Sequence, residues 1–321
     1  DYNDLTLPDN GHLFREISST VADSLLFDAT NNINIEDSDQ YFVTGSTPSN
    51  YIWYSGKLWR AVSIDTADNS VKLVTQWNIS AIPYSDGNSS FKDSYIEKWL
   101  NDTSVDGFLG NLREPERFIV MDAKWNATET EEITKPAEIT MVEDAVGLLN
   151  YYEYITSYRG TTASEGYLNN ELYWWTLTPY SSSNVRFISN YGIAVSDDDP
   201  TGAGGVRPSI NLKASVKIIS GNGTVDNPYR LNGDDDTNLS GTLLNTRYSG
   251  EYIRFGVGEN NLYRIVSHEN GTGTKITSAE PLKKGVTFIE SAFGSNTTFS
   301  STNTIGTFLN NDYLNPVNGY L

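Results

Sequence analysis

Two stretches of the chain carry the same alternation of aromatic or β-branched residues with polar ones. In the first, Tyr51-Ile52-Trp53-Tyr54 is followed by a polar turn and by Leu58-Trp59-Arg60-Ala61-Val62-Ser63. In the second, Tyr252-Ile253-Arg254-Phe255 is followed by a turn and by Leu262-Tyr263-Arg264-Ile265-Val266-Ser267. Strand-like segments on both sides of a turn predict a β-hairpin in each stretch.

Each predicted hairpin continues into a third strand and then into a short helix. The third strands cover residues 71–75 and 274–278. The segment Ile96-Glu97-Lys98-Trp99-Leu100-Asn101 matches Ile305-Gly306-Thr307-Phe308-Leu309-Asn310 in spacing, and Ser94 with Glu97 forms a capping box before the first helix. A repeat period of about 200 residues predicts two related domains and not a solenoid, whose period is tens of residues.

The rest of the first copy predicts mixed structure. Thr140 with Glu143 indicates a second capped helix through residues 142–149. Short strands separated by turn residues are predicted at residues 173–176, 184–189, 192–196 and 205–213. The expected fold class is therefore α+β, a mixed domain with short antiparallel strands, two helices and long loops, followed by a partial second β-rich module.

The same pattern predicts the domain boundaries. We expect a lead-in at residues 1–50 packed on the first module, a complete module at residues 51–231, an acidic linker at residues 232–238 and an incomplete second module at residues 239–321. An incomplete β module leaves unpaired strand edges. Either the remainder of the second module is absent from this sequence, or another subunit completes the fold by strand addition.

Composition narrows the classes of partner. The chain has 22 Lys+Arg against 41 Asp+Glu, a formal charge of −19 that repels polyphosphate and anionic lipid, so nucleic acid is not an expected partner. No cysteine is present, which excludes disulfides, thiolate metal sites and thiol chemistry. Cysteine avoidance with abundant Asn, Ser, Thr, Gly and Tyr suits the outer face of Gram-positive bacteria. It predicts an extracellular or cell-surface location, without direct membrane insertion of this segment.

Two further motifs carry a resemblance. Tyr173-Trp174-Trp175-Thr176-Leu177-Thr178-Pro179, followed by Gly205-Val206-Arg207-Pro208-Ser209-Ile210-Asn211-Leu212, resembles a family of bacterial exported domains. That family pairs an aromatic-Trp-Ser/Thr-x-Ser/Thr-Pro strand with a closing Val-Arg-Pro strand, and the Trp59-Arg60 hairpin and the helix containing Trp99 are similar to its other landmarks. It is distantly similar to the C-type-lectin-like fold. The resemblance implies a lectin-like domain on a secreted or surface-anchored protein.

The sequence departs from the functional motifs of the families with this fold. A calcium-dependent lectin site needs Glu-Pro-Asn or Gln-Pro-Asp and a Trp-Asn-Asp segment. Here Glu114-Pro115 continues with Glu116, and Leu100 separates Trp99 from Asn101. Calcium-dependent sugar binding is therefore not carried over, and the formylglycine-generating activity is excluded because it needs reactive cysteines.

Aromatic residues supply the candidate ligand-binding positions. Trp174, Trp175 and Tyr180 could stack on a glycan or a peptide. Because adjacent residues on a strand point to opposite faces, at least one of the two Trp is expected in the core, and burial of both is favoured over a ligand-binding platform. Arg60 and Arg207 lie inside apolar strands, so we expect structural roles for them as buried partners of carboxylates or carbonyls, alongside Trp59 and Trp99.

Two runs of acidic residues are the candidate calcium ligands. Asp197 and Asp199 belong to one Asp triplet, and Asp234 and Asp236 to another. Calcium takes six to eight oxygen ligands from flexible loops. Three adjacent Asp side chains cannot all face one ion, so a solvated acidic turn is favoured over calcium binding. Calcium is the one cofactor considered.

No catalytic constellation stands out in the sequence. His12 and His268 fall in different predicted modules, and a Gly-x-Ser-x-Gly elbow is absent. The clustered carboxylates Glu114, Glu116, Glu143 and Asp144 are candidates for hydrolysis by proximity alone. The predicted function is a non-enzymatic, adhesin-like surface protein that recognises a host or surface glycan or protein. A structural subunit of a filament or surface layer, assembled through other copies of itself, is the alternative, and a secreted carboxylate-dependent hydrolase is third.

Overall fold

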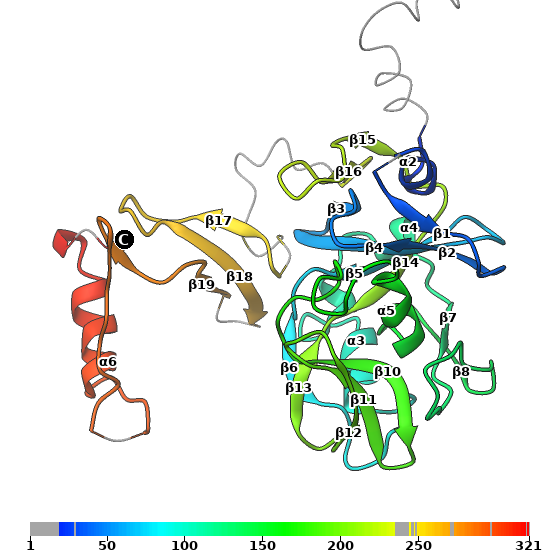
Figure 1. Cartoon of the computed structure of the whole chain (residues 1–321). Helices are drawn as coiled ribbons and strands as arrows, with labels where there is room; N and C mark the ends of the chain where they lie inside the picture. Colours follow the sequence, from blue (N-terminus) through cyan, green and yellow to red (C-terminus); the bar gives the residue numbers. More distant parts are fainter. Residues whose placement is uncertain are drawn as a thin grey trace, which may run out of the picture. The chain divides into compact units, whose positions relative to one another are not determined.

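The structure is a computed structural model that describes residues 19–28, 30–234, 244, 247, 249–269, 273–295, 297–318 and 320. It divides into two compact units, Asp1–Leu239 and Ser240–Leu321, and each is described by itself (Figure 1). Strands dominate and the helices are few and short. The predicted α+β class is confirmed.

The larger sheet of the first unit is built around the predicted meander. Its nine strands are β1 (Asn32–Asn34), β2 (Gln40–Thr44), β3 (Tyr51–Tyr54), β4 (Lys57–Asp65), β5 (Val71–Thr75), β9 (Val146–Gly147), β14 (Ser209–Leu212), β15 (Ile218–Ser220) and β16 (Tyr229–Leu231). The order is β15-β16-β3-β4-β5-β14-β9, while β2 pairs with the end of β4 and β1 pairs with β2. The expected lead-in therefore contributes two strands to the sheet, and its residues 1–18 lie outside the described residues.

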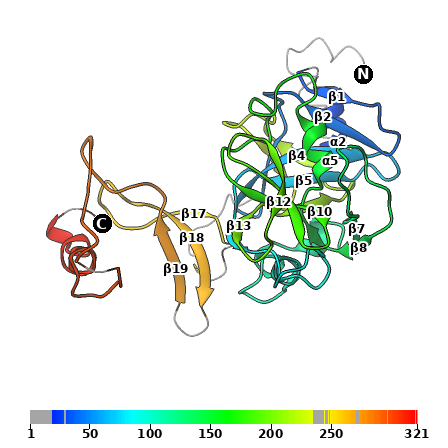
Figure 2. The same cartoon turned by 60° about the horizontal axis from the view of Figure 1, so that its bottom comes forward.

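A second sheet and a ribbon complete the strands of the first unit (Figure 2). The five-stranded sheet has the order β12-β11-β10-β13-β6. Its strands are β6 (Ser80–Pro83), β10 (Trp174–Ser181), β11 (Asn184–Ile188), β12 (Ala194–Asp198) and β13 (Ala203–Val206). The ribbon pairs β7 (Ala123–Asn126) with β8 (Met141–Asp144). The strands predicted at residues 173–176, 184–189 and 192–196 are present, whereas the single strand predicted at residues 205–213 is divided between β13 and β14, which belong to different sheets.

The helices of the first unit are short. They are α2 (Val21–Phe27), α3 (Tyr95–Asn101), α4 (Pro115–Phe118), α5 (Tyr151–Ser157) and the 3-10 turn η2 (Leu109–Asn111). The prediction of α3 is confirmed, and Ser94 Oγ accepts a hydrogen bond of 3.0 Å from the Glu97 amide. Helix α5 contacts both β2 and β10, so it lies between the two sheets.

The predicted helix at residues 142–149 is wrong, because this segment forms β8 and β9. Val146 pairs with Ile210 of β14. Gly147 lies so close to Trp125 that a Cβ would fall 2.4 Å from a ring atom. The helix begins later, where the Asn150 and Glu153 side chains form a capping box at the start of α5.

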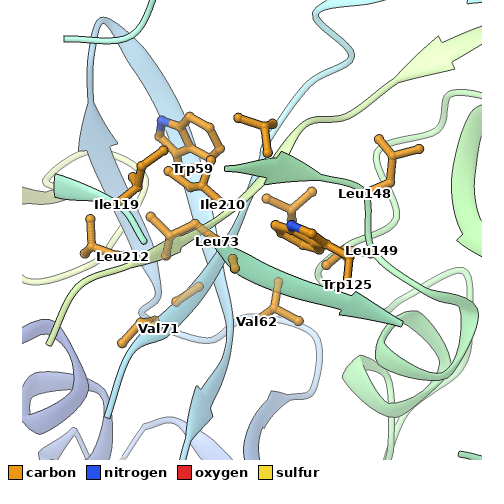
Figure 3. Close-up of a cluster of buried hydrophobic side chains, with 14 of the residues drawn as sticks. Trp59, Val62, Val71, Leu73, Ile119, Trp125, Leu148, Leu149, Ile210 and Leu212 are labelled. Carbon is orange, nitrogen blue, oxygen red and sulfur yellow. The ribbon is translucent and has the colours of Figure 1, made fainter. Parts of the chain in front are cut away.

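The core of the first unit gathers side chains from strands that are distant in the sequence (Figure 3). Trp59 of β4, Leu73 of β5 and Ile210 of β14 are fully buried, together with Trp125 of β7. Because side chains alternate along a strand, Lys72 points away from the face that carries Leu73. The polar positions on that other face define the candidate site described below.

The second unit has a three-stranded sheet of order β17-β18-β19. Its elements are β17 (Tyr252–Arg254), β18 (Leu262–Glu269), β19 (Gly273–Ser278), β20 (Lys283–Lys284), β21 (Thr287–Phe288), α6 (Thr304–Thr307), the π-helical turn η4 (Phe308–Tyr313) and the 3-10 turn η5 (Pro316–Asn318). The predicted meander and short helix are present. Within the described part of this unit, the buried apolar side chains are Tyr263 and Ile265.

The meanders of the two units share one strand register. In both, a β-bulge interrupts the pairing of the second and third strands at the same position. The corresponding pairs are Tyr51–Arg60 with Tyr252–Arg264, Ala61–Leu73 with Ile265–Ile276, and Ser63–Lys72 with Ser267–Lys275. The sequence similarity thus extends to the pairing of individual residues.

Side-chain contacts follow the same correspondence. The Arg60 guanidinium lies 3.6 Å from the centre of the Tyr51 ring, and the Arg264 guanidinium lies 4.8 Å from the centre of the Tyr252 ring. In each unit, the short helix that follows carries an Asn whose side-chain amide donates to the carbonyl four residues earlier, at 3.2 Å for Asn101 and 2.8 Å for Asn310.

The sheet edges differ between the units. In the first, β14 pairs with the outer edge of β5, and β16 pairs with the outer edge of β3. In the second, β17 and β19 pair with β18 and with no other described strand.

Candidate functional site

The first unit has two cavities of about 260 and 230 Å³ that lie beside the polar face of the large sheet. They share the lining residues Gln40, Asp65, Lys72 and Lys124. We refer to the two cavities together as the polar groove. Cavities with converging polar groups are the default candidates for ligand binding.

The floor of the polar groove is a row of polar side chains from neighbouring strands. Ser63 of β4 lies opposite Lys72 of β5, and Lys72 lies opposite Asn211 of β14. Ser63 Oγ donates a hydrogen bond of 2.9 Å to Gln40 Oε1 of β2. The β-bulge between Ala61 and Ser63 shifts the register of β4 by one residue, so that Ser63 pairs with Lys72.

Lys72 forms a buried ion pair at this floor. Its ammonium binds Glu153 Oε1, and the two side chains are 10% and 3% exposed. Glu153 Oε2 accepts a hydrogen bond of 2.8 Å from the Asn150 amide at the start of α5. The Lys72 ammonium also lies 4.9 Å from the centre of the Trp125 ring. Because both charged groups are buried, removing either one would leave the other buried without a counter-charge, which is destabilising. The ion pair also joins β5 to α5.

The rim of the polar groove is acidic and carries one bridging lysine. Lys135 Nζ lies 2.8 Å from Asp37 Oδ1 and 2.7 Å from Asp39 Oδ2. Burial acts to lower the pKa of Lys135, but the hydrogen bonds and charges of the two carboxylates outweigh it and raise that pKa. The hydrogen bond from Lys135 lowers the pKa of Asp39. The bridge is therefore charged at neutral pH.

Lys124 lies between the two cavities and lines both of them. It is exposed, and it forms no ion pair within the described residues. Asn126 and Asn211 add side-chain amides to the lining. Ammonium and amide groups can together donate to and accept from a hydroxylated or peptide-like ligand.

Ser63, on the floor of the polar groove, is not an activated nucleophile. The Ser63 hydroxyl donates to Gln40, and the nearby Lys72 ammonium is held by Glu153. A nucleophilic serine needs an adjacent base that accepts its proton. The Gln40 amide oxygen, to which Ser63 donates, is not such a base.

A carboxyl pair lies outside the polar groove, between Asp144 of β8 and Glu97 of α3. Burial, and then the charge and hydrogen bond of Glu97, raise the pKa of Asp144 to about 6. Neither residue lines the two cavities.

The other sequence-predicted carboxylates form a surface pair. Glu114 adopts a left-handed backbone conformation, with φ of 41°, at the start of α4, and its side chain contacts Arg117 at 3.1 Å. The side chains of Glu114 and Arg117 are more than half exposed. Glu114 and Glu116 therefore do not form a buried acid–base pair.

The predicted ligand platform at Trp174 and Trp175 is corrected, because both indoles are 1% exposed. Although the two rings point to opposite faces of β10, both faces are covered. Trp174 packs against Tyr154 at 5.4 Å, and Trp175 packs against Tyr84 at 5.6 Å between ring centres. Neither ring presents a face to a ligand.

The third aromatic candidate, Tyr180, is partly exposed and lies next to a cation. The Arg186 guanidinium lies 5.0 Å from the Tyr180 ring centre and 4.5 Å from the Tyr151 ring centre. Arg186 also donates to the carbonyls of Thr130 and Glu131. Tyr180 is thus part of an Arg-centred packing cluster.

The structure does not gather the predicted calcium ligands. Asp234 is buried, accepts a hydrogen bond of 3.0 Å from the Ser55 amide and pairs with Arg113 at 3.4 Å, so its calcium role is corrected to an ion pair. Asp199 accepts hydrogen bonds from the Thr201 amide and hydroxyl in a turn. The Asp197 side chain and Asp236 lie outside the described residues, among which no metal-binding cluster of three acidic or His residues occurs.

The four predicted structural residues pack in the first unit. Trp59 is fully buried, and Trp99 packs partly buried against the core. Arg60 donates to Asn50 Oδ1 at 2.7 Å, and Arg207 donates to the carbonyls of Thr75 and Leu168. Burial lowers the pKa of Arg60 to about 10 and that of Arg207 to about 9, so both remain charged at neutral pH.

Sequence reasoning missed the polar groove. One available signal was Lys72 inside the apolar run Val71-Lys72-Leu73-Val74, and another was the capping pattern of Asn150 with Glu153. Neither signal indicates that the two charges meet, because Lys72 and Glu153 are brought together by the packing of α5 on the sheet.

Comparisons with known proteins add one finding. Residues 68–214 match a family described as "Domain of unknown function (DUF6273)", so this part of the first unit contains such a domain. The match includes Lys72, Lys124, Glu153 and Asn211 of the polar groove. No curated protein and no solved structure matches the chain. Among the described residues, no helix has the length and apolar character needed to cross a membrane.

Proposed function

We propose that this chain is a non-enzymatic, extracellular surface protein whose first unit binds a ligand in the polar groove. The observation that carries the proposal is the row of Gln40, Ser63, Lys72 and Asn211 on four neighbouring strands, held in place by the Lys72–Glu153 pair. A fixed array of donors and acceptors in a cavity recognises polar ligands without chemistry.

The charges of the polar groove favour a neutral or cationic ligand. Acidic side chains outnumber lysines in its lining, and the chain carries a formal charge of −19. An anionic ligand would be repelled by this field. We propose a neutral glycan or a polar peptide segment of a host or surface protein as the ligand.

The fold and location remain part of this proposal. A C-type-lectin-like arrangement of the first unit is supported by the motif resemblance at residues 173–179 and 205–212. The extracellular location is supported by the absence of cysteine from the chain. A calcium-independent mode of binding is consistent with the ion pair of Asp234.

The test is binding of the full chain to arrays of neutral glycans and of surface-protein peptides, repeated with two variants. Lys124→Ala removes an exposed ammonium that lines both cavities, while Lys98→Ala removes an exposed lysine of α3 that lines neither. Loss of one charged hydrogen bond corresponds to about tenfold weaker binding or more. We expect that loss for Lys124→Ala and no change for Lys98→Ala. Equal effects of the two variants, or preferential binding of anionic glycans, would contradict the proposal.

A structural subunit of an extracellular filament or layer is the second candidate function. The observation that favours it is that β17 and β19 of the second unit pair with β18 and with no other strand in the described part of the chain. Unpaired edges are templates for pairing with another chain. This candidate is independent of the polar groove, and both functions can reside in one protein.

A secreted hydrolase is the least supported candidate. Asp144 has a raised pKa beside Glu97, but these carboxyl groups do not line the two cavities. A measured hydrolytic rate that Asp144→Asn abolishes would revive this candidate.

A further inference from the structure

The larger cavity of the polar groove is lined by carboxylates from two separate segments. Asp65 and Asp68 come from the end of β4 and the turn that leads to β5, and Asp122 directly precedes β7. Within the described residues, none of the three carboxylates forms an ion pair with a lysine or an arginine. The cavity therefore gathers negative charge that the described side chains do not neutralise.

Two lysines line the same cavity, but the charge of one is already compensated. The Lys72 ammonium is bound by the Glu153 carboxylate. Lys124 is exposed and lines both cavities of the polar groove. Three carboxylates therefore stand against one uncompensated ammonium in the lining of the larger cavity, and this excess of negative charge attracts a cation.

The turn between β4 and β5 holds two of these carboxylates in place. The Asp65 amide donates to the Ser70 carbonyl at 2.9 Å, and the Asn69 amide donates to the Asp65 carbonyl at 3.0 Å. Asp65 Oδ1 accepts from the Ala67 amide and Asp68 Oδ1 accepts from the Ser70 amide, each at 2.7 Å. Each carboxylate is therefore oriented by one oxygen, and its Oδ2 has no partner within the described residues.

A buried hydroxyl in the same lining also lacks a partner. Ser70 is 6% exposed and lines the larger cavity, yet its hydroxyl forms no hydrogen bond within the described residues. The side-chain amide of Asn211 on β14 lines the cavity as well, and it too has no partner among those residues. Because buried polar groups are normally hydrogen-bonded, the partner of the Ser70 hydroxyl has to come from within the cavity.

The volume and the walls of the larger cavity suit a single long side chain. Its volume of about 260 Å³ lies below the range of about 300–1,000 Å³ that is typical of pockets for drug-sized ligands. Val120 and Ala123 add apolar surface beside the carboxylates. An aliphatic chain with a charged end matches this lining, because it packs its methylene groups on apolar surface and directs its charge to polar groups.

We infer that the larger cavity of the polar groove binds the ammonium group of a lysine side chain. An ammonium has three donors that can reach separate oxygens, such as those of Asp65, Asp68 and Ser70. A guanidinium fork instead pairs best with a carboxylate whose two oxygens are both available. The inference rests on the proposed function and sharpens it, because it assigns the ligand to a lysine-containing peptide and not to a neutral glycan.

The test measures binding of two tripeptides, acetylated and amidated at their ends, to the full chain by saturation-transfer difference NMR. Gly-Lys-Gly carries the ammonium, whereas Gly-(Nε-acetyl-Lys)-Gly keeps the aliphatic chain without the charge. We expect saturable binding of the lysine peptide and about tenfold weaker binding of the acetyl-lysine peptide. Raising the ionic strength from about 0.01 M to about 0.15 M should weaken binding of the lysine peptide, because salt screens the attraction.

A matched pair of protein variants tests where the ammonium binds. Asp68→Asn removes a charge that lines the larger cavity and keeps an oxygen for the Ser70 amide. It should weaken binding of the lysine peptide by about threefold and leave the acetyl-lysine peptide unaffected. Asp106→Asn removes an exposed carboxylate that lines neither cavity, so it should change neither affinity.

Several outcomes would overturn the inference. These are absence of lysine-peptide binding at roughly 10 mM, equal affinities of the two tripeptides, and equal effects of Asp68→Asn and Asp106→Asn. Tighter binding of glucosamine than of the lysine peptide would also overturn it, because the ammonium would then belong to a sugar. Each outcome can occur while Lys124→Ala still weakens binding of an array ligand, which would leave the proposed function intact. The proposed function itself fails if Lys124→Ala and Lys98→Ala act equally on every ligand.

Discussion

The meanders of the two units have the same register and bulge and the same Arg-over-Tyr contact, but they differ in burial. Val62 is fully buried and Val266 is 46% exposed. Lys72 is buried, whereas its counterpart Lys275 is exposed. Hairpin geometry therefore arises from the local sequence, while burial depends on what packs over the sheet.

The polar side chains on the large sheet of the first unit form a candidate site because α5 and β14 pack beside them. Helix α5 brings Glu153 to Lys72, and β14 brings Asn211 beside it. In the second unit, Ser267 and Lys275 form the same strand pair, and Lys275 is exposed. The same polar strand pair therefore lines a cavity in the first unit because α5 and β14 pack beside it.

The largest expected contrast comes from removing the two lysines in turn. Lys72→Ala leaves the Glu153 carboxylate buried and unpaired, so we expect the first unit to lose about 3–5 kcal/mol of unfolding free energy. Lys275→Ala removes an exposed charge and should cost less than about 1 kcal/mol. Tryptophan fluorescence during urea unfolding reports the first unit alone, because all seven Trp lie between residues 53 and 175. Far-UV circular dichroism follows both units.

The double variant Lys72→Met, Glu153→Leu is the control for this comparison. Removing both partners leaves no buried charge, so the double variant should recover much of the stability that Lys72→Ala loses. A loss below about 1 kcal/mol for Lys72→Ala would mean that water reaches the ion pair, and the floor of the polar groove would then be more open than the structure indicates.

The second contrast uses the two valines at the β-bulge. Val62→Thr places a hydroxyl in a fully buried position, so a loss of about 1–3 kcal/mol is expected. Val266→Thr alters a half-exposed side chain and should change stability by less than about 0.5 kcal/mol. Urea unfolding with the same two signals measures both. An equal loss at the two positions would show that Val266 is covered in solution.

Sequence patterns were sufficient for the elements whose signals are local. The period-two pattern of residues 51–54 and 58–63 predicted β3 and β4, and the Ser94 cap predicted α3. The helix predicted at residues 142–149 is wrong, although the apolar spacing and the Thr140–Glu143 capping pattern of this segment fit a helix. Pairing of Val146 with Ile210 and the contact of Gly147 with Trp125 stabilise strands there, and both interactions are invisible to a local pattern.

The candidate site depended almost wholly on such long-range contacts. Gln40, Ser63, Lys72 and Asn211 are unremarkable polar residues in four separate strands, and only the strand order places them in one row. Conversely, Trp174 and Trp175 attracted attention as aromatic neighbours, yet packing on both faces of β10 buries them. Residue type alone indicated candidate ligand-binding residues, but tertiary packing determines which of these side chains are accessible to a ligand.

The smallest contrast concerns pH and the helix that follows each meander. Glu97 of α3 faces Asp144, whereas Gly306 occupies the matching position in the second unit. Burial and Glu97 raise the pKa of Asp144 from its ordinary value of 3.8 to about 6. The folded first unit thus binds more protons than the unfolded chain between about pH 4 and pH 6, so its unfolding free energy should fall as pH rises through this window.

Asp144→Asn should remove this pH dependence and stabilise the first unit by about 1 kcal/mol at pH 7.5, a value reduced because Asp144 is partly exposed. Glu116→Gln removes an exposed carboxylate of α4 that is not among the groups acting on Asp144, so it is the control and should preserve the wild-type profile. Fluorescence-monitored urea unfolding at several pH values between 4 and 7.5 measures all three proteins. If the wild type and Asp144→Asn differ by the same amount at every pH, the carboxyl pair does not titrate in this range. In that case the presence of Glu97 in the first unit and of Gly306 in the second would not make the stabilities of the two units respond differently to pH.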